Sequence, residues 1–320
     1  MEYLQTGQMI RELRKRKGLS QEQLCEGLCE PPTMSKIEKG RQYPNKKLLD
    51  ALLVRLHECA ELQVPLSPSD FERAQIEREV ISRVSNHDYE LLELAERYRN
   101  CASSMNKHEQ QFYRFTQAVH ATAIPDNWDF VLAEFERAIQ LTIPRYRVGA
   151  DISTAMLTSV EFTILNNIAI CLWFLDQRKE AVALMEQLYE VLDGQDLDRE
   201  EYAKRLPLIA YHLSMWLGVE AAYEKSLAVA EKGIQCSIKY GKYALLADLL
   251  YNKGYTLLKL GRDREGTAVL QKAFMLMYAG DNAKAYEAFR NDLLQSFGAA
   301  LWDGIRSCLL PDSLSREATL

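Results

Sequence analysis

The sequence has 320 residues, of which 48% are hydrophobic and 26% charged, and its formal net charge is -6. This balance is typical of a chain that can bury a core, and the length is sufficient for two domains. The sequence contains no run of about 18 apolar residues, and its N-terminus contains no apolar signal segment. We therefore expect no membrane span and no secretion, and we predict a cytoplasmic protein.

Charge and cysteine usage add two further constraints. Residues 1–60 contain 11 Lys and Arg against 8 Asp and Glu, whereas the rest of the chain contains 28 against 37. A local excess of positive charge suits a surface that faces phosphate. The seven scattered cysteines indicate a reduced cytosolic protein. Cys25 and Cys29, with His57 and Cys59, could bind a metal, but their spacing matches no zinc module, and buried cysteines are the alternative.

The distribution of apolar residues predicts an all-α protein. They recur at three- and four-residue spacing along most of the chain, and strand signals are nearly absent. Pro65 and Pro68 interrupt helix formation and mark the clearest boundary. We predict three parts: an N-terminal domain over residues 1–65, a linker helix over residues 66–85 and a repeat domain over residues 86–320.

The N-terminal domain is predicted to contain three short helices. The first spans Thr6–Lys17 and ends at Gly18. Ser20 caps the second helix, Gln21–Leu28, and the third helix spans Thr33–Lys39. Two short helices joined by a tight turn, of which the second presents polar side chains, have the geometry that fits the major groove of DNA.

These helices resemble the lambda-repressor-like family of helix-turn-helix regulators from Gly7 to Pro44. The matching residues are Ile10, Leu13, Arg14, Lys15, Lys17, Gly18, Leu19, Ser20, Gln21, Leu24, Ser35, Lys36, Ile37, Glu38, Lys39, Gly40 and Pro44. The turn that ends at Ser35 is shorter than in most of that family and is similar to a narrower group, the peptide-responsive Rgg, PlcR and PrgX regulators of Gram-positive bacteria. That group also carries a helical repeat domain, so the resemblance implies a DNA-binding regulator that responds to a peptide.

The resemblance also suggests roles for single residues. It places Gln21 at a phosphate, where an amide and a helix N-terminus both donate hydrogen bonds. Lys36 could donate to guanine and Thr33 could contact a base edge, whereas a solvated surface lysine is the alternative for Lys36. Arg14 and Glu38 resemble the internal ion pair of the family. The predicted DNA-binding residues are Gln21, Pro32, Thr33, Lys36, Lys39, Arg41, Asn45 and Lys46.

The small size of such a module predicts a dimer. One module buries roughly 600–1,000 Å² on DNA. Useful affinity therefore requires two modules about one turn of DNA apart. We expect a homodimer that binds a palindromic operator in double-stranded DNA and that is held together by helices of the repeat domain.

Beyond residue 86 the predicted helices form antiparallel pairs. The two clearest pairs are Thr163–Phe174 with Lys179–Leu192, and Tyr243–Leu260 with Arg264–Tyr278. Each pair has a small residue early in its second helix and another twelve positions earlier, which gives Ala169 with Ala181 and Gly254 with Gly266. This pattern predicts tetratricopeptide-like repeats that stack into a right-handed superhelix, and a plain helical bundle is the alternative.

A superhelix of this kind has a concave face that commonly binds extended peptides, whose backbone groups can be satisfied by side-chain amides. Alignment of the pairs by their small residues puts a polar side chain at one repeated position. The predicted peptide-binding residues are Asn167, Asn252, His212, Gln117, Thr163, Tyr211, Asp248 and Tyr255. The family resemblance implies contact with peptide backbone for Asn167 and Asn252. The alternative is that these amides cap neighbouring helices or face water.

Two other functions are alternatives to the binding of a short signalling peptide. The repeats could instead bind a protein partner. Catalysis is the second possibility, because related repeat proteins include phosphatases. The sequence contains no phosphate-binding G-x-x-x-x-G-K-[ST] loop, no G-x-S-x-G elbow and no metal-ligand cluster. We therefore expect neither catalysis nor a cofactor.

Overall fold

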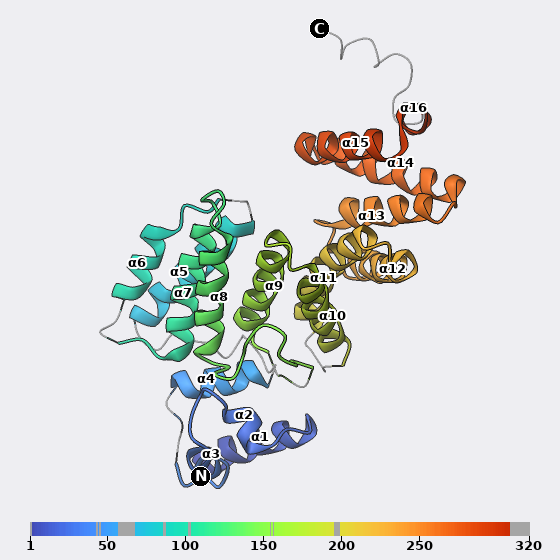
Figure 1. Cartoon of the computed structure of the whole chain (residues 1–320). Coiled ribbons are helices and arrows are strands. Elements are labelled where there is room, and N and C mark those ends of the chain that lie inside the picture. Colours follow the sequence, from blue (N-terminus) through green and yellow to red (C-terminus); the bar gives the residue numbers. More distant parts are fainter. Residues whose placement is uncertain are drawn as a thin grey trace. The chain divides into compact units, whose positions relative to one another are not determined.

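The computed structural model describes residues 2–42, 44, 46–56, 68–85, 88–101, 104–153, 155, 157–194 and 199–307. Its regular elements are α-helices, and no strand occurs in these ranges, which confirms the predicted all-α fold. The helices (Figure 1) are α1 Glu2–Arg16, α2 Gln21–Cys25, α3 Pro31–Glu38, α4 Lys46–Arg55, α5 Pro68–Ser85, α6 Leu92–Asn100, α7 Lys107–Ala121, α8 Trp128–Gln140, α9 Ser159–Phe174, α10 Arg178–Gly194, α11 Arg199–Val219, α12 Tyr223–Tyr240, α13 Leu246–Lys259, α14 Asp263–Ala279, α15 Ala283–Phe297 and α16 Ala299–Arg306.

The chain forms two compact units, Met1–Asp198 and Arg199–Leu320. Unit 1 contains α1–α10 and unit 2 contains α11–α16. The division between them falls inside the predicted repeat domain. Among the described helices of both units, none is long and apolar enough to cross a membrane.

Helices α1–α4 open unit 1, and we refer to residues 2–56 as the N-terminal module. Its core is a cluster of fully buried apolar side chains, namely Ile10, Leu24, Met34, Ile37, Leu52 and Leu56. Apolar residues at three- and four-residue spacing give each helix one face toward this cluster. Burial of one such side chain contributes roughly 1.5–3 kcal/mol. The cluster therefore fixes the relative positions of four short helices.

Local sequence sets the ends of α2 and α3. The Ser20 hydroxyl accepts from the Gln23 N–H and the Gln23 side chain accepts from the Ser20 N–H, which is the predicted capping box. The prediction for the end of this helix was wrong: α2 ends at Cys25, because Gly27 adopts a left-handed φ of 71°. Helix α3 begins at Pro31, earlier than predicted, because the first positions of a helix need no N–H.

Helix α5 lies within the predicted linker, the repeat helices of unit 1 are α6–α10, and the pair predicted around Ala169 and Ala181 corresponds to α9 and α10. Both small residues are fully buried. Helix α9 begins before the predicted Thr163, because Thr158 and Glu161 form a capping box at its start. Helices α7, α8 and α9 lie side by side (Figure 1), and α8 packs on both of its neighbours.

In unit 2 the helices α13 and α14 approach each other closely at the predicted pair of glycines. A Cβ added to Gly254 would lie 2.6 Å from the Leu270 Cγ atom and 3.1 Å from the Gly266 carbonyl oxygen. A Cβ added to Gly266 would lie 3.0 Å from the Gly254 carbonyl oxygen. Only glycine permits this approach, so the sequence-based prediction of close helix packing at these positions is confirmed.

We predict that Gly254→Ala destabilises the full-length protein by about 1–3 kcal/mol, because the added methyl group must displace Leu270 or separate the two helices. The measurement is the free energy of unfolding from urea titrations followed by circular dichroism.

Gly304→Ala is the matched control. Gly304 lies within α16, and an added Cβ there would meet no atom within 4 Å. The higher helix propensity of alanine should therefore stabilise this variant by up to about 1 kcal/mol. Equal losses of stability in the two variants would show that the close approach of α13 and α14 does not cause the destabilisation of Gly254→Ala.

Candidate nucleic-acid interface and ligand face

The outer side of α3 carries the residues predicted to contact bases. Met34 and Ile37 are fully buried in the core, whereas Pro32 and Lys36 are exposed and Thr33 is half-buried. Lys36 lies one helical turn after both Pro32 and Thr33, so the three residues share one surface. This surface combines a positive charge and a hydroxyl, which are groups that can donate to phosphate or to base edges.

Positive charge continues beyond the end of α3. Lys39 and Arg41 directly follow the helix, and both are exposed. Asn45 lies outside the described residues. Lys46 begins α4, but its side chain lies outside them as well. The contacts of all these residues with DNA stay predictions.

An ion pair joins α1 to α3 beneath this surface. The Arg14 Nε atom lies 2.5 Å from the Glu38 Oε1 atom, and the Arg14 Nη2 atom donates to Glu38 Oε2 at 2.9 Å. Arg14 also donates to the Leu19 carbonyl oxygen at 2.6 Å. Burial would raise the pKa of Glu38, but hydrogen bonds from Arg14 and Gln21 outweigh burial, and the pKa is lowered. The predicted internal ion pair is therefore confirmed.

The same carboxylate holds the side chain of Gln21. The Gln21 Nε2 atom donates to Glu38 Oε2 at 2.7 Å, which fixes the start of α2 against the end of α3. An amide nitrogen carries two hydrogens, so one bond to Glu38 still permits a second to a phosphate oxygen. The predicted phosphate contact of Gln21 stays a prediction.

The four polar residues at the repeated position lie on the first helix of successive pairs. Gln117 is on α7 and Asn167 on α9 in unit 1, and His212 is on α11 and Asn252 on α13 in unit 2. In unit 1 both amides bond within their own helix. The Gln117 Nε2 atom donates to the Tyr113 hydroxyl at 3.0 Å, and the Asn167 Nδ2 atom donates to the Thr163 carbonyl oxygen at 2.8 Å. Such single-turn bonds join no second helix.

Asn252 has a different environment from Asn167. Its Nδ2 atom donates to the Tyr211 carbonyl oxygen at 3.0 Å and to the Ser214 Oγ atom at 2.9 Å, both on α11. The residue is only 7% exposed. These bonds join α13 to the middle of α11, so the amide neither caps a helix nor faces water, and its contact with a peptide stays a prediction. Both hydrogens of the Asn252 Nδ2 atom are used in these two bonds. A ligand at Asn252 would therefore bond to the side-chain oxygen Oδ1.

The other ligand candidates of unit 2 are partly enclosed. Burial lowers the pKa of His212 to about 4, so its ring is neutral near pH 7, between the rings of Tyr211 and Trp216. Burial raises the pKa of Asp248. The Tyr255 hydroxyl donates to the Ser296 Oγ atom at 3.3 Å. In unit 1, the Thr163 hydroxyl donates to the Ser159 carbonyl oxygen of its own helix at 2.9 Å.

Helix α15 contributes residues that the sequence analysis missed. Phe289 stacks on Tyr251 with ring centroids 4.1 Å apart, and Asp292 accepts from the Tyr251 hydroxyl at 2.5 Å. Tyr251 is therefore buried by its neighbours. No pair of small residues aligns α15 with the other repeats, so no sequence pattern indicates its contacts.

Sequence comparison assigns both parts of the chain. Residues 78–290 match the RNPP family C-terminal domain, and residues 5–58 match a helix-turn-helix domain. The first match covers more than half of the chain. The chain belongs to the RNPP family. This assignment confirms the resemblance on which the sequence-based prediction was built, and it places the chain in a family of regulators rather than of enzymes.

Solved structures show the same fold as this RNPP-family chain. PlcR of Bacillus thuringiensis in complex with the peptide PapR7 and DNA is 22% identical, with a TM-score of 0.53 over 88% of this chain and 99% of that one. The apo form of that PlcR is 21% identical, with a TM-score of 0.55 over 90% and 98%. The apo form of the competence regulator ComR from Streptococcus vestibularis is 13% identical, with a TM-score of 0.52 over 93% and 99%. No curated protein matches the chain significantly.

The cysteines considered for a metal site lie in the N-terminal module. Cys25 is buried and Cys29 half-buried, and burial raises the pKa of both thiols, that of Cys29 to about 11. A thiol must lose its proton to bind a metal, so this environment favours the buried-cysteine alternative. His57 and Cys59 lie outside the described residues. Within the described part of the chain, no three potential metal ligands form a cluster.

We predict that Glu38→Gln destabilises the RNPP-family protein by about 1–3 kcal/mol at pH 7, because a charge-assisted bond to buried Arg14 is lost. The folded-state pKa of Glu38 lies below its ordinary value of 4.5. The pair therefore stabilises the protein above about pH 4.5 and loses that effect as the pH falls through the lower folded value.

The measurement is the melting temperature between pH 7 and pH 3. The difference between wild type and Glu38→Gln should shrink as the pH falls. Glu22→Gln, a change at an exposed carboxylate of α2, is the control and should follow the wild type. If the difference in melting temperature between wild type and Glu38→Gln stayed constant across this pH range, the stabilising role of the Arg14–Glu38 ion pair would be contradicted.

Proposed function

We propose that this RNPP-family protein is a DNA-binding transcription regulator whose repeat domain binds a short signalling peptide, as in quorum sensing, and thereby alters DNA binding. The main support is the exposed surface of α3, on which Lys36 lies beside Pro32 and Thr33 in a module that matches a helix-turn-helix domain. The family match of residues 78–290 supports the sensing role. The solved complexes of PlcR with PapR7 and DNA and of S. thermophilus ComR with DNA and ComS are consistent with both roles.

The organisation proposed for this function has three parts. Residues 1–65 form the DNA-binding domain, residues 66–85 the linker helix and residues 86–320 the domain for peptide binding and dimerisation. A homodimer on a palindromic operator would bring two N-terminal modules to neighbouring major grooves. A cytoplasmic location is part of this proposal, because a regulator of this kind must reach its operator.

The peptide hypothesis rests on the amides of the repeat helices. An extended peptide offers unpaired backbone N–H and C=O groups, and an amide side chain can both donate and accept. Among the described residues, the side-chain amides of Gln117 and Asn167 donate hydrogen bonds that span one turn of their own helices, and these can be exchanged for bonds to a ligand. A peptide can regulate DNA binding only if it binds one conformation of the protein more tightly than another.

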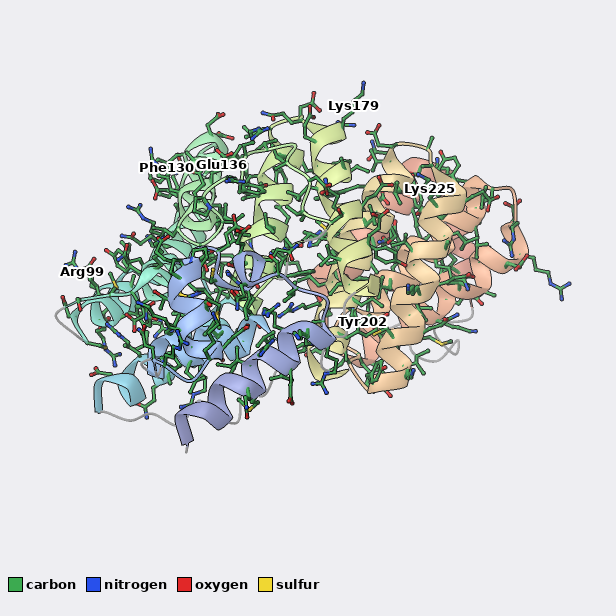
Figure 2. The ribbon with its side chains drawn as sticks, turned by 90° about the horizontal axis from the view of Figure 1, so that it is seen from below. Arg99, Phe130, Glu136, Lys179, Tyr202 and Lys225 are labelled. Carbon is green, nitrogen blue, oxygen red and sulfur yellow. The ribbon has the colours of Figure 1, made fainter. Side chains whose placement is uncertain are left out.

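A protein partner is the second candidate ligand, and one group of exposed aromatic residues favours it. Phe130 is 52% exposed and Phe174 59% exposed, and Phe130 is labelled at the surface of α8 in Figure 2. Trp128 stacks on Phe174 with ring centroids 4.4 Å apart. Exposed apolar side chains that lie together often mark a protein contact.

The test of DNA binding is a selection from a library of random duplexes with the full-length protein at low salt. Enrichment of a palindromic sequence with half-sites about one turn apart, or a multiple of it, is expected. A library that stays random after repeated rounds would refute the proposal. Titration of the enriched complex with short synthetic peptides then separates the two ligands, because a protein partner predicts no effect of any peptide.

We predict that Lys36→Ala reduces discrimination at one position of the selected site by about 1–3 kcal/mol, because a bond to a base edge is lost. The measurement is the dissociation constant for the selected duplex and for its single-position variants. Lys179→Ala, on α10 (Figure 2), removes an exposed lysine from the repeat domain and should change neither affinity nor discrimination. Uniformly weaker binding to all duplexes would instead make Lys36 a phosphate contact.

We predict that Asn167→Ala weakens the binding of an active peptide about tenfold, the equivalent of about 1.4 kcal/mol, because one hydrogen bond to the peptide backbone is lost. DNA binding without peptide should be unchanged, since the amide bonds only to the Thr163 carbonyl of its own helix. Asn252→Ala is the comparison, and it should also lower stability, because the bonds to α11 are removed. An unaltered dose response of Asn167→Ala would remove that residue from the ligand face.

A further inference from the structure

Arg55, the last residue of α4, binds the end of α2. The residue is 3% exposed. Its Nη1 atom donates to the Leu24 carbonyl oxygen at 3.3 Å and to the Glu26 carbonyl oxygen. The last carbonyl groups of a helix have no partner within the helix and carry partial negative charge. Arg55 therefore satisfies the end of α2 directly before the turn that leads to α3.

The same guanidinium group extends to the repeat helices of unit 1. Its Nη2 atom donates to the Glu161 Oε1 atom at 3.2 Å, and the Glu161 side chain is fully buried. The other oxygen of Glu161 accepts from the Thr158 N–H at 2.7 Å, as the reciprocal bond of the capping box that starts α9. One arginine thus connects the α2–α3 turn to the beginning of α9.

A backbone contact lies beside this ion pair. Gly27, in the α2–α3 turn, approaches the end of α8 so closely that an added Cβ would lie 2.2 Å from the Thr142 carbonyl oxygen. The Thr142 hydroxyl accepts from the Gln111 Nε2 atom of α7 at 2.6 Å. The turn is therefore held by α8 and α9, and α7 supports α8 at the same point. Figure 1 shows α4 between α2 and the ends of these helices.

Electrostatics make the contact sensitive to the loss of either partner. Burial would raise the pKa of Glu161, but the charge of Arg55 and the hydrogen bonds of the site outweigh it, and the pKa is lowered. Burial lowers the pKa of the neighbouring His108, so its ring is neutral near pH 7 and does not compete with Arg55 for the carboxylate. A buried charge that loses its partner is strongly destabilised. A cavity of about 200 Å³ lies next to Arg55 and is also lined by Glu26 and Thr142.

The contact leaves the predicted DNA-binding surface uncovered. Pro32, Lys36 and Lys39 are exposed while Arg55 and Glu161 are joined. Within unit 1, the repeat helices thus hold the N-terminal module at the end of α2 and leave the outer side of α3 free. Helix α9 also carries Thr163 and Asn167, which are predicted to bind the peptide.

We propose that Glu161 is a positioning residue for DNA recognition: through Arg55 it fixes the α2–α3 turn to the start of α9, so that the repeats set the direction in which α3 meets DNA. This inference rests on the proposed DNA-binding function. It also implies that a ligand bound to α9 acts directly on the N-terminal module, because α9 carries the predicted ligand residues and contacts that module through Glu161.

The first test uses Glu161→Gln in the full-length protein. Glutamine keeps the size of the side chain and can still accept from Thr158, but the ion pair is lost. Hydrogen exchange of backbone amides in α2 and α3 should become faster, while exchange in α14 stays as in the wild type. Glu109→Gln is the matched control, because Glu109 also belongs to a capping box and pairs with a buried arginine, but that arginine is Arg73 of α5 and not a residue of the N-terminal module.

A second variant tests the same contact without changing a charge. Gly27→Ala places a methyl group against the Thr142 carbonyl oxygen and should also release the turn. Gly18→Ala is its control, because Gly18 has a similar φ of 70° but an added Cβ would meet nothing within 4 Å. Both alanines therefore carry the same backbone strain, and only Gly27→Ala disturbs the contact. This variant decides the question if Glu161→Gln does not fold.

The functional measurement uses the palindromic duplex from the selection and versions of it with the half-sites moved apart by about half a turn of DNA. The wild type should discriminate strongly between these spacings, and Glu161→Gln and Gly27→Ala should reduce that discrimination by about fivefold or more. The proposal would be overturned if both variants kept the amide exchange rates and the spacing discrimination of the wild type. It would also be overturned if the two controls changed as much as the two variants. A wild type that binds no duplex refutes the DNA-binding function, whereas the exchange measurement still tests the contact itself.

Discussion

A charge that is taken out of water must find a partner, and two arginines impose this constraint on the N-terminal module. Arg14 pairs with Glu38 and donates to the Leu19 carbonyl, which ties α1 to α3 and to the turn before α2. Arg55 donates to the carbonyl oxygens of Leu24 and Glu26 at the end of α2 and pairs with Glu161 through its two terminal nitrogens. The apolar core fixes the relative positions of the four helices, and these two groups add directional contacts among the helices and to α9. The exposed surface of α3 is a consequence of both.

Much of the fold could be predicted, because local rules decide it. Ser20 and Gln23 form the capping box that the sequence indicates, and Gly254 and Gly266 lie where two helices approach each other closely. The error at the end of α2 has the same local origin. Apolar periodicity continues to Leu28, but Gly27 takes a left-handed conformation that no periodic pattern reveals. The order and pairing of the helices follow from sequence, whereas their ends depend on single backbone angles.

The site could be predicted only in part. Arg14 and Glu38 were found through a family resemblance, and the exposure of Lys36 follows from the burial of its neighbours Met34 and Ile37. The bond between Arg55 and Glu161 joins residues 106 positions apart, and no local pattern indicates it. The repeated polar position shows a second limit. Asn167 and Asn252 occupy equivalent places, yet one bonds within its own helix and the other joins two helices. The identity of a side chain does not determine which of its possible partners it meets.

The distance along the chain between Arg55 and Glu161 also has a consequence for biosynthesis. The carbonyl groups of Leu24 and Glu26 can receive Arg55 as soon as α4 has formed, but Glu161 is added 106 residues later. At a translation rate of about 5–20 residues per second, this delay lasts roughly 5–20 seconds. During that interval the arginine lacks its carboxylate and stays hydrated. The N-terminal module thus reaches its final position only after the ribosome has made α9, and a chain that stops earlier would lack this connection.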